Sequence, residues 1–204
     1  MKKDIINVIK SKQNIYIICW FLFFFPLKTQ LDNGLMLVFD LLFRNGITSA
    51  VFNYNYTGTF TGCEKIKEIV KANLYFNWFQ KHGIYWIKFL PSLFAFIFLF
   101  KRWKKDNYFK NLDWFLIIIA CFSILTSLND LISLLFYFDN YSSEQILRLL
   151  PTVFVFLSIG AFIFFKIFNF KERLQAIIFG ILGFYGSFFL WMQFLGPKIL
   201  PIIH

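Results

Sequence analysis

The sequence has few of the side chains that carry catalysis and metal binding. It contains two His and three Cys in 204 residues. His82 and His204 are too few for the His-based sites that bind zinc, and the motif His-Glu-x-x-His does not occur. Cys19, Cys63 and Cys121 lie far apart and form no Cys-x-x-Cys pair. This spacing argues against a thiol oxidoreductase of the quinone-coupled type and favours three free thiols.

Motifs that bind nucleotides or activate serine are also absent from the sequence. There is no phosphate loop, no Gly-x-Ser-x-Gly and no dinucleotide fingerprint. Charged residues make up 16% of the chain, whereas they make up about a quarter of a soluble domain. The net charge of +10 is spread along the ends of apolar segments, which favours membrane insertion over nucleic-acid binding. We therefore expect no cofactor, no metal and no direct nucleic acid partner.

The sequence is rich in apolar and aromatic residues. It is 58% hydrophobic and 23% aromatic, with 32 Phe, and its mean hydropathy is +0.61. This composition is typical of a polytopic membrane protein, in which each span needs about 20 mostly apolar residues. We predict an all-α membrane helix bundle that forms a single domain over residues 1–204, with five spans at residues 14–27, 83–100, 112–138, 145–165 and 174–195.

The ends of these predicted spans carry the usual boundary residues. The first span is short, and the flanking Lys12 and Lys28 extend it by snorkelling to the two interfaces. It resembles a signal peptide without a cleavage site, so we interpret it as an uncleaved anchor. Pro91 and Pro151 are expected in the first turns of their spans, where a missing N–H costs little. The last span is expected to stop at Gly196-Pro197.

The distribution of Lys and Arg predicts the orientation in the membrane. Basic clusters lie at residues 2–12, 101–110 and 166–173, whereas the loop at 139–144 has no Lys or Arg. Short loops rich in Lys and Arg stay in the cytoplasm. With five spans, the N-terminus is then inside and the C-terminus outside. We expect a multi-pass protein of the bacterial inner membrane.

A long segment at residues 28–82 is expected outside, between the first two spans. Residues 35–43 are apolar but too short to span, which favours a re-entrant or interfacial helix. Residues 64–80 form an amphipathic pattern, which predicts either a helix on the surface of the bundle or of the membrane, or a lid over a site or a partner-docking surface. Residues 55–57 match the glycosylation sequon, which matters only in a eukaryotic secretory pathway. The outer segment is therefore predicted to be partly helical.

Polar residues inside spans are costly, so they mark candidate sites. The third predicted span carries a polar stripe, which is either a pore lining or a helix contact, at Ser123, Thr126, Ser127, Asp130 and Ser133. The second places Lys88, Ser92 and Ala95 on one face. The fifth has a small-residue stripe that allows close helix approach, at Ala176, Gly180, Gly183 and Ser187.

Four polar residues are expected at similar depth in the outer half of the bundle. They are Lys88, Asp130, Arg148 and Gln193. One interpretation is a structural ion pair that holds helices together. The other is a polar pocket for a lipid headgroup, an ion or a small anion. The sequence does not decide between these interpretations, because it does not give the helix neighbours.

Three functions remain open on this sequence. The first is a non-enzymatic accessory or self-associating membrane subunit, whose partners are the lipid bilayer and a second copy or another membrane protein. Small multi-pass accessory proteins of bacterial defence loci, including those beside CRISPR nucleases, have this size and composition, although no motif ties the chain to them. The second is an oligomeric channel or small transporter with the polar stripe as its lining. The third is an outer-leaflet protein that binds or modifies lipid headgroups.

Overall fold

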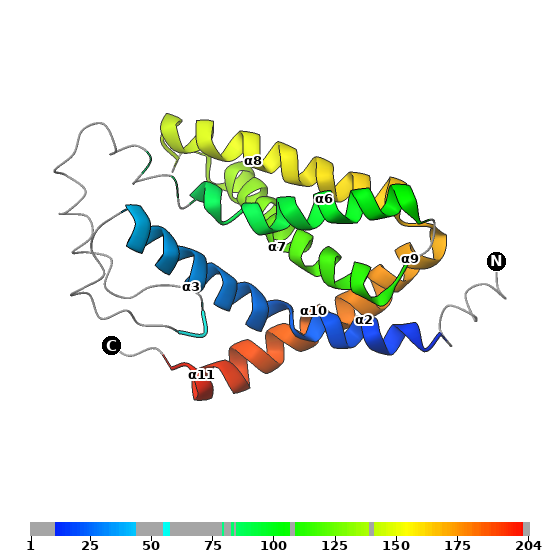
Figure 1. Cartoon of the computed structure of the whole chain (residues 1–204). Helices are drawn as coiled ribbons and strands as arrows, with labels where there is room; N and C mark the ends of the chain where they lie inside the picture. Colours follow the sequence, from blue (N-terminus) through cyan, green and yellow to red (C-terminus); the bar gives the residue numbers. More distant parts are fainter. Residues whose placement is uncertain are drawn as a thin grey trace. The chain divides into compact units, whose positions relative to one another are not determined.

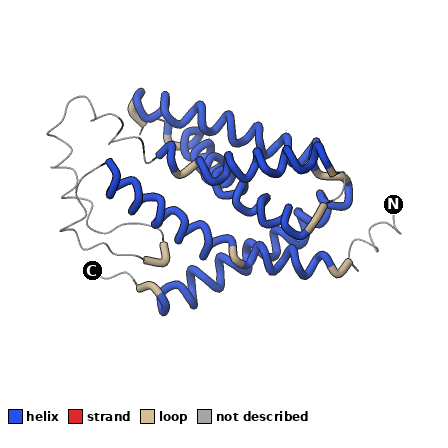
Figure 2. Tube along the Cα trace, viewed as in Figure 1, coloured by secondary structure: helices blue, strands red, loops and turns tan. Residues whose placement is uncertain are grey.

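The computed structural model of the chain describes residues 11–43, 55–57, 79, 83, 85–106, 109–138 and 141–201. Within these ranges the structure is helical, with short turns and no strand (Figure 2). The chain divides into two compact units. Unit 1 holds residues 1–20 and 91–181, and unit 2 holds residues 21–90 and 182–204. The predicted all-α class is thus confirmed for the described part of the chain.

Unit 1 is built on three helices that lie side by side (Figure 1). They are α6 (Leu90–Lys105), α7 (Asn111–Phe136) and α8 (Ser143–Phe162), and α8 continues into a π-helical turn, η3 (Ile163–Ile167). Ser142 caps α8 by accepting the backbone N–H of Gln145. Phe162 of α8 meets the rings of Phe96 and Phe100 on α6 at 6.0 and 5.7 Å between centroids. Aromatic side chains therefore fill the contact between α6 and α8.

Two further segments complete unit 1. They are α2 (Gln13–Leu22) and the run formed by α9 (Phe170–Gln175) and η4 (Ala176–Gly180). The buried Gln175 amide donates to the buried Asn14 side chain at 2.7 Å. Trp20 of α2 lies against Phe115 of α7, with ring centroids 5.1 Å apart. A polar contact and a ring contact thus join α2 to the rest of the unit.

Unit 2 pairs α3 (Phe24–Phe43) with the last helical run of the chain. This run consists of α10 (Ile181–Phe188), η5 (Phe189–Leu195) and α11 (Gly196–Ile199). The backbone N–H of Phe25, in the unbonded first turn of α3, donates to Ser187 Oγ of α10 at 3.0 Å. The rings of Phe24 and Phe184 meet edge to face. A side chain of α10 thereby caps the start of α3.

The short segment at residues 55–57 is fixed between these elements of unit 2. Asn33 of α3 donates its side-chain amide to the carbonyl of Asn55 at 3.0 Å. The Trp191 indole N–H donates to the carbonyl of Tyr56 at 2.9 Å, and the Tyr56 N–H donates to the carbonyl of Leu200 at 3.0 Å. We call this arrangement the Tyr56 clamp. Asn55 of the sequon is fully buried, so its side chain is not presented as a glycosylation acceptor.

Three helices are long and apolar enough to cross a membrane. They are Asn111–Phe136, Gln145–Ile167 and Phe170–Ile199. The bent pair of α2 and α3 makes a fourth if it is one span. This supports a membrane helix bundle, and it agrees within a few residues with the predicted third and fourth spans. The count of five spans stays a prediction.

The helical run does not end where the first span was predicted to end, at Leu27. The helix breaks at Phe23, and α3 then runs through residues 35–43 without interruption, so these residues are not a separate helix. Pro26 is the third residue of α3, where no helical N–H bond is lost, so this proline marks a helix start and not an end. Lys28 pairs with Asp32 one turn later at 2.7 Å, and its charge is therefore compatible with a helix interior.

Three other predicted boundaries also differ. The second span was placed at 83–100, whereas α6 begins at Leu90 and continues through the basic residues to Lys105, because Lys and Arg form helix well and favour its C-terminus. Pro151 lies inside α8, not in its first turn. The last helix does not stop at Gly196-Pro197 but continues to Ile199, since Pro197 fits the first turn of α11.

Several predictions fall outside the described residues. They concern the amphipathic pattern of residues 64–80, most of the turn region around 45–58, and Cys63, His82 and His204. Cys19 and Cys121 are described, and both are free thiols, as predicted.

Candidate functional site

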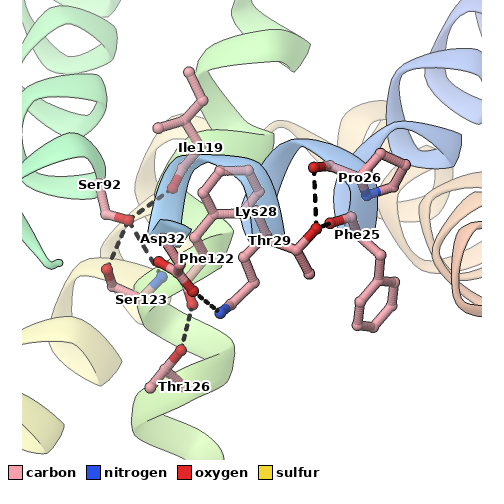
Figure 3. Close-up of polar contacts among 10 residues, drawn as sticks. All are labelled: Phe25, Pro26, Lys28, Thr29, Asp32, Ser92, Ile119, Phe122, Ser123 and Thr126. Atoms are coloured by element: carbon pink, nitrogen blue, oxygen red, sulfur yellow. Dashed lines mark hydrogen bonds and ion pairs between the residues drawn. The ribbon is translucent and has the colours of Figure 1, made fainter. Parts of the chain in front are cut away.

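Hydroxyl groups of the predicted polar stripe lie in contacts between helices of unit 1. The buried Ser92 of α6 donates its hydroxyl to the carbonyl of Ile119 at 2.7 Å and accepts the hydroxyl of Ser123 at 2.7 Å (Figure 3). On the neighbouring turn, the buried Ser127 hydroxyl donates to the carbonyl of Thr152 on α8 at 3.5 Å. Ser123 and Ser127 therefore join α7 to α6 and α8 within one chain.

The other members of the stripe differ from these two. Thr126 donates to the carbonyl of Phe122 in its own helix at 2.8 Å (Figure 3). Ser133 is only half-buried, one turn before the end of α7. In the fifth predicted span, Gly180, Gly183 and Ser187 are buried. Ala176, the fourth member of this stripe, is half-buried, and a common close-packing face for the four positions stays a prediction.

The four residues of the predicted outer cluster belong to both units. Asp130 and Arg148 lie in unit 1, half-buried on α7 and α8, each near the short connection between these helices. Lys88 lies in the turn before α6, and Gln193 is exposed on η5; both belong to unit 2. A cluster of all four residues stays a prediction.

A polar segment of α3 was not identified as part of a helix from the sequence. Lys28 and Asp32 form an ion pair at 2.7 Å, and both side chains are mostly buried (Figure 3). Between them, Thr29 is buried and donates its hydroxyl to the carbonyl of Phe25 at 2.9 Å. The two charges pair with each other, and the Thr29 hydroxyl is satisfied by a carbonyl of its own helix, so these polar groups have partners inside α3. This segment is therefore best explained as structural.

A cavity of about 220 Å³ lies in unit 1 where α6 ends and α7 begins. The last residues of η3 and the connection to α9 close its other side. The residues that line it include Arg102, Trp103, Asp106, Phe109, Asp113 and Lys166. We call it the α6–α7 cavity. Its position among two of the three basic clusters places it at the end of the unit predicted to face the cytoplasm.

A buried ion pair forms the base of the α6–α7 cavity. Arg102 Nε donates to Asp113 Oδ1, and the other carboxylate oxygen accepts the backbone N–H of Lys110 at 2.7 Å. The Asp113 side chain is 3% exposed, whereas that of Arg102 is 21% exposed. Asp113 thus holds the end of α6 and also caps the first turn of α7.

The chemistry of this cavity is that of charge recognition. The residues that line it include no His, Cys, Ser or Thr that could act as a nucleophile. Among the described residues, no group of three or more His, Cys, Asp and Glu side chains could hold a metal ion. The cavity offers two cations, two carboxylates and three aromatic rings. Such a set offers ion-pair partners for groups of either sign and ring faces for a cation.

Sequence reasoning missed this cavity. Arg102 and Lys166 were used only as indicators of orientation, and Asp113 was not singled out. The useful signal was Asp113 in the first turn of an apolar helix, directly after a basic segment, where an acidic residue caps the helix and pairs with nearby cations.

Comparison with known proteins gives no relative for this chain: no protein-family profile, no curated protein and no solved structure matches it.

Proposed function

We propose that the chain is a non-enzymatic integral membrane protein of the bacterial inner membrane that acts as a self-associating subunit. Support comes from serine hydroxyl groups that form hydrogen bonds between helices. Ser123 and Ser127 join helices of unit 1, and Ser187 caps a helix of unit 2. Side chains that hydrogen-bond across helices stabilise packed helices in a membrane, so these hydroxyl groups have a structural use.

We propose that the exposed face of α8 is the contact between two copies of the chain. Large apolar side chains stand out from this face and from its continuation in η3, with Leu147 77%, Phe154 75% and, in η3, Phe165 63% exposed. Between them lie two small residues, Ser158 and Ala161, which are also exposed. Within the described residues the Ser158 hydroxyl makes no hydrogen bond. We call the gap above these two small residues the Ser158 notch. Lipid tails cannot hydrogen-bond to a hydroxyl. A second copy of α8 packed on the notch, with Ser158 facing Ser158, would give each Ser158 hydroxyl a hydrogen-bond partner.

We predict that Ser158→Leu weakens self-association in lipid. The leucine fills the notch and removes the hydroxyl, and interhelical hydrogen bonds in membranes are worth about 0.6 to 1.7 kcal/mol, so affinity should fall about three- to twentyfold. The measurement is energy transfer between donor- and acceptor-labelled chains in liposomes, over a series of protein-to-lipid ratios.

Asn129→Leu is the matched control, since it removes an exposed polar side chain from α7 near a helix end, where headgroups and water satisfy it. Its energy transfer should match that of the wild type. A wild-type chain that stays monomeric at every ratio contradicts self-association, and an unchanged Ser158→Leu variant contradicts the α8 face.

The basic clusters also restrict the number of spans. If residues 2–12 and 101–110 both face the cytoplasm, the chain between them crosses the membrane an even number of times. The three helices that follow then place the C-terminus outside. We propose that the total is three or five, because four spans would put one basic cluster outside. With three spans, the bent pair of α2 and α3 is re-entrant.

A reporter enzyme that is active only outside the cytoplasm tests this orientation. Fused after His204 it should be active, and fused after Lys105 it should be inactive, since the orientation depends on Lys and Arg in the short loops. A reporter inserted in the loop at 139–144 serves as a positive control. Activity after Lys105 together with none after His204 would reverse the proposed orientation.

A further inference from the structure

The α6–α7 cavity has the size of a small polar group. Its volume is about 220 Å³. A water molecule takes about 30 Å³ in the liquid, so the cavity has room for about seven waters or for one small polar headgroup. It lies where α7 begins and η3 ends, at the ends of two helices that are long and apolar enough to cross a membrane. The ends of membrane-spanning helices meet the lipid headgroups.

The charges that line the cavity are of both signs. Arg102 and Asp113 neutralise each other at the base. Asp106 lies on the rim and accepts from Lys110 Nζ at 3.3 Å, with a guanidinium nitrogen of Arg102 3.9 Å away. Lys166 lines the cavity opposite them, is exposed, and has no ion-pair partner within the described residues. The cavity therefore presents a cation without an ion-pair partner and a rim carboxylate.

Aromatic rings form the remaining wall. Phe109 and Phe168 line the cavity 5.5 Å apart, and both pack against the buried Trp114 behind them. Trp103 lines the cavity as well. The faces of such rings attract alkylammonium groups, and more strongly when a carboxylate is near. The carboxylate rim and the aromatic wall together suit an organic ammonium group.

We propose that the α6–α7 cavity binds the phosphoethanolamine-type zwitterion of a phospholipid headgroup. The phosphate lies toward Lys166, and the ammonium lies toward Asp106 and the aromatic wall. A zwitterion satisfies both signs of charge at once. A purely anionic headgroup would meet Lys166 but would also face the Asp106 carboxylate on the rim, since the Asp113 carboxylate is already paired with Arg102. This proposal does not depend on self-association through α8.

Native mass spectrometry of the purified full chain tests the proposal. The protein is released from non-ionic micelles that contain equal amounts of phosphatidylethanolamine and phosphatidylglycerol. We expect one retained phosphatidylethanolamine. Lys166→Gln should reduce its retention about fivefold, as expected for the loss of an ion pair at an exposed site. Lys171→Gln is the matched control, because Lys171 is exposed nearby but does not line the cavity.

Removing the charge of Asp106 distinguishes binding of a zwitterionic headgroup from binding of a simple anion. Asp106→Asn should lower the retention of phosphatidylethanolamine and raise that of phosphatidylglycerol. Equal retention of both lipids by the wild type, or stronger phosphatidylethanolamine binding by Asp106→Asn, overturns the proposal.

Competition with soluble phosphoethanolamine at millimolar concentration is a separate experiment. Displacement of the lipid shows that the headgroup alone is recognised, and no displacement shows that the acyl chains contribute to binding. Thermal unfolding of each variant establishes that it is folded.

Discussion

Asp113→Ala is expected to destabilise the protein by about 3 to 4 kcal/mol. Most of this is the cost of leaving Arg102 without its buried partner, which is about 3 kcal/mol at the lower end of the usual range because Arg102 is partly exposed. The lost cap on the Lys110 N–H adds about 1 kcal/mol. The measurement is the free energy of unfolding in detergent micelles, followed by circular dichroism.

Companion variants separate the two roles of Asp113. Asp113→Asn keeps an oxygen for the Lys110 N–H but removes the charge, so it should be less destabilising than Asp113→Ala. Adding Arg102→Met to Asp113→Asn should recover part of the loss, since no uncompensated charge remains. Asp106→Ala is the control, because its pairs lie nearer the surface and are worth about 1 kcal/mol or less. If Asp113→Ala costs no more than Asp106→Ala, the ion pair does not stabilise the fold.

The apolar spans are the part of the fold that the sequence predicts well. The bounds of α7 and α8 agree with the prediction within a few residues, apart from a π-helical extension after α8. Both runs are continuous and apolar, and charged or polar residues flank them, so hydropathy alone places them. A membrane protein with several spanning helices follows from this signal without knowledge of any contact.

Breaks inside a helical run are harder to predict. Phe23 interrupts the run from Gln13 to Phe43, yet it is apolar like its neighbours. Pro26 gives a signal three residues later, but a proline is compatible with the end of one helix and with the start of the next. What decides between them is the acceptor that Ser187 supplies to the free N–H of Phe25. That acceptor lies 162 residues away in sequence, so no local pattern contains it.

The candidate sites also depend on contacts between residues that no local sequence pattern contains. Hydropathy identified Ser123 and Ser127 because a hydroxyl in an apolar run is conspicuous. Arg102 and Asp113 lie in a basic connecting segment and at the start of a helix, where charged residues are common. Their pairing depends on how the end of α6 packs against the start of α7, which brings residues 11 positions apart into contact. Their burial, and with it their energetic importance, is a property of the packed unit alone.

Gly196→Ala is expected to disrupt the Tyr56 clamp and to destabilise unit 2 by about 3 kcal/mol. A Cβ at position 196 would lie 2.5 Å from the carbonyl oxygen of Trp191 and 2.7 Å from the Cβ of Tyr56. Both are too close, and the first is a backbone atom, so the helix itself must shift. The shift strains the hydrogen bonds that Tyr56 makes with Trp191 and Leu200, each worth about 1 kcal/mol.

The measurement is thermal unfolding in detergent, together with the fluorescence of Trp191 in a variant whose other Trp residues are replaced by Phe. Trp191 is 8% exposed, so opening of the clamp should shift its emission to the red. Gly160→Ala is the control: its Cβ would lie 3.1 Å from a methyl group of Ile124, which can move, and alanine favours the helix by about 1 kcal/mol. That variant should stay within about 1 kcal/mol of the wild type. Equal stability of the two variants would mean that the Tyr56 clamp accommodates the methyl group with no loss in the free energy of unfolding, and that Gly196 is not required where α11 begins.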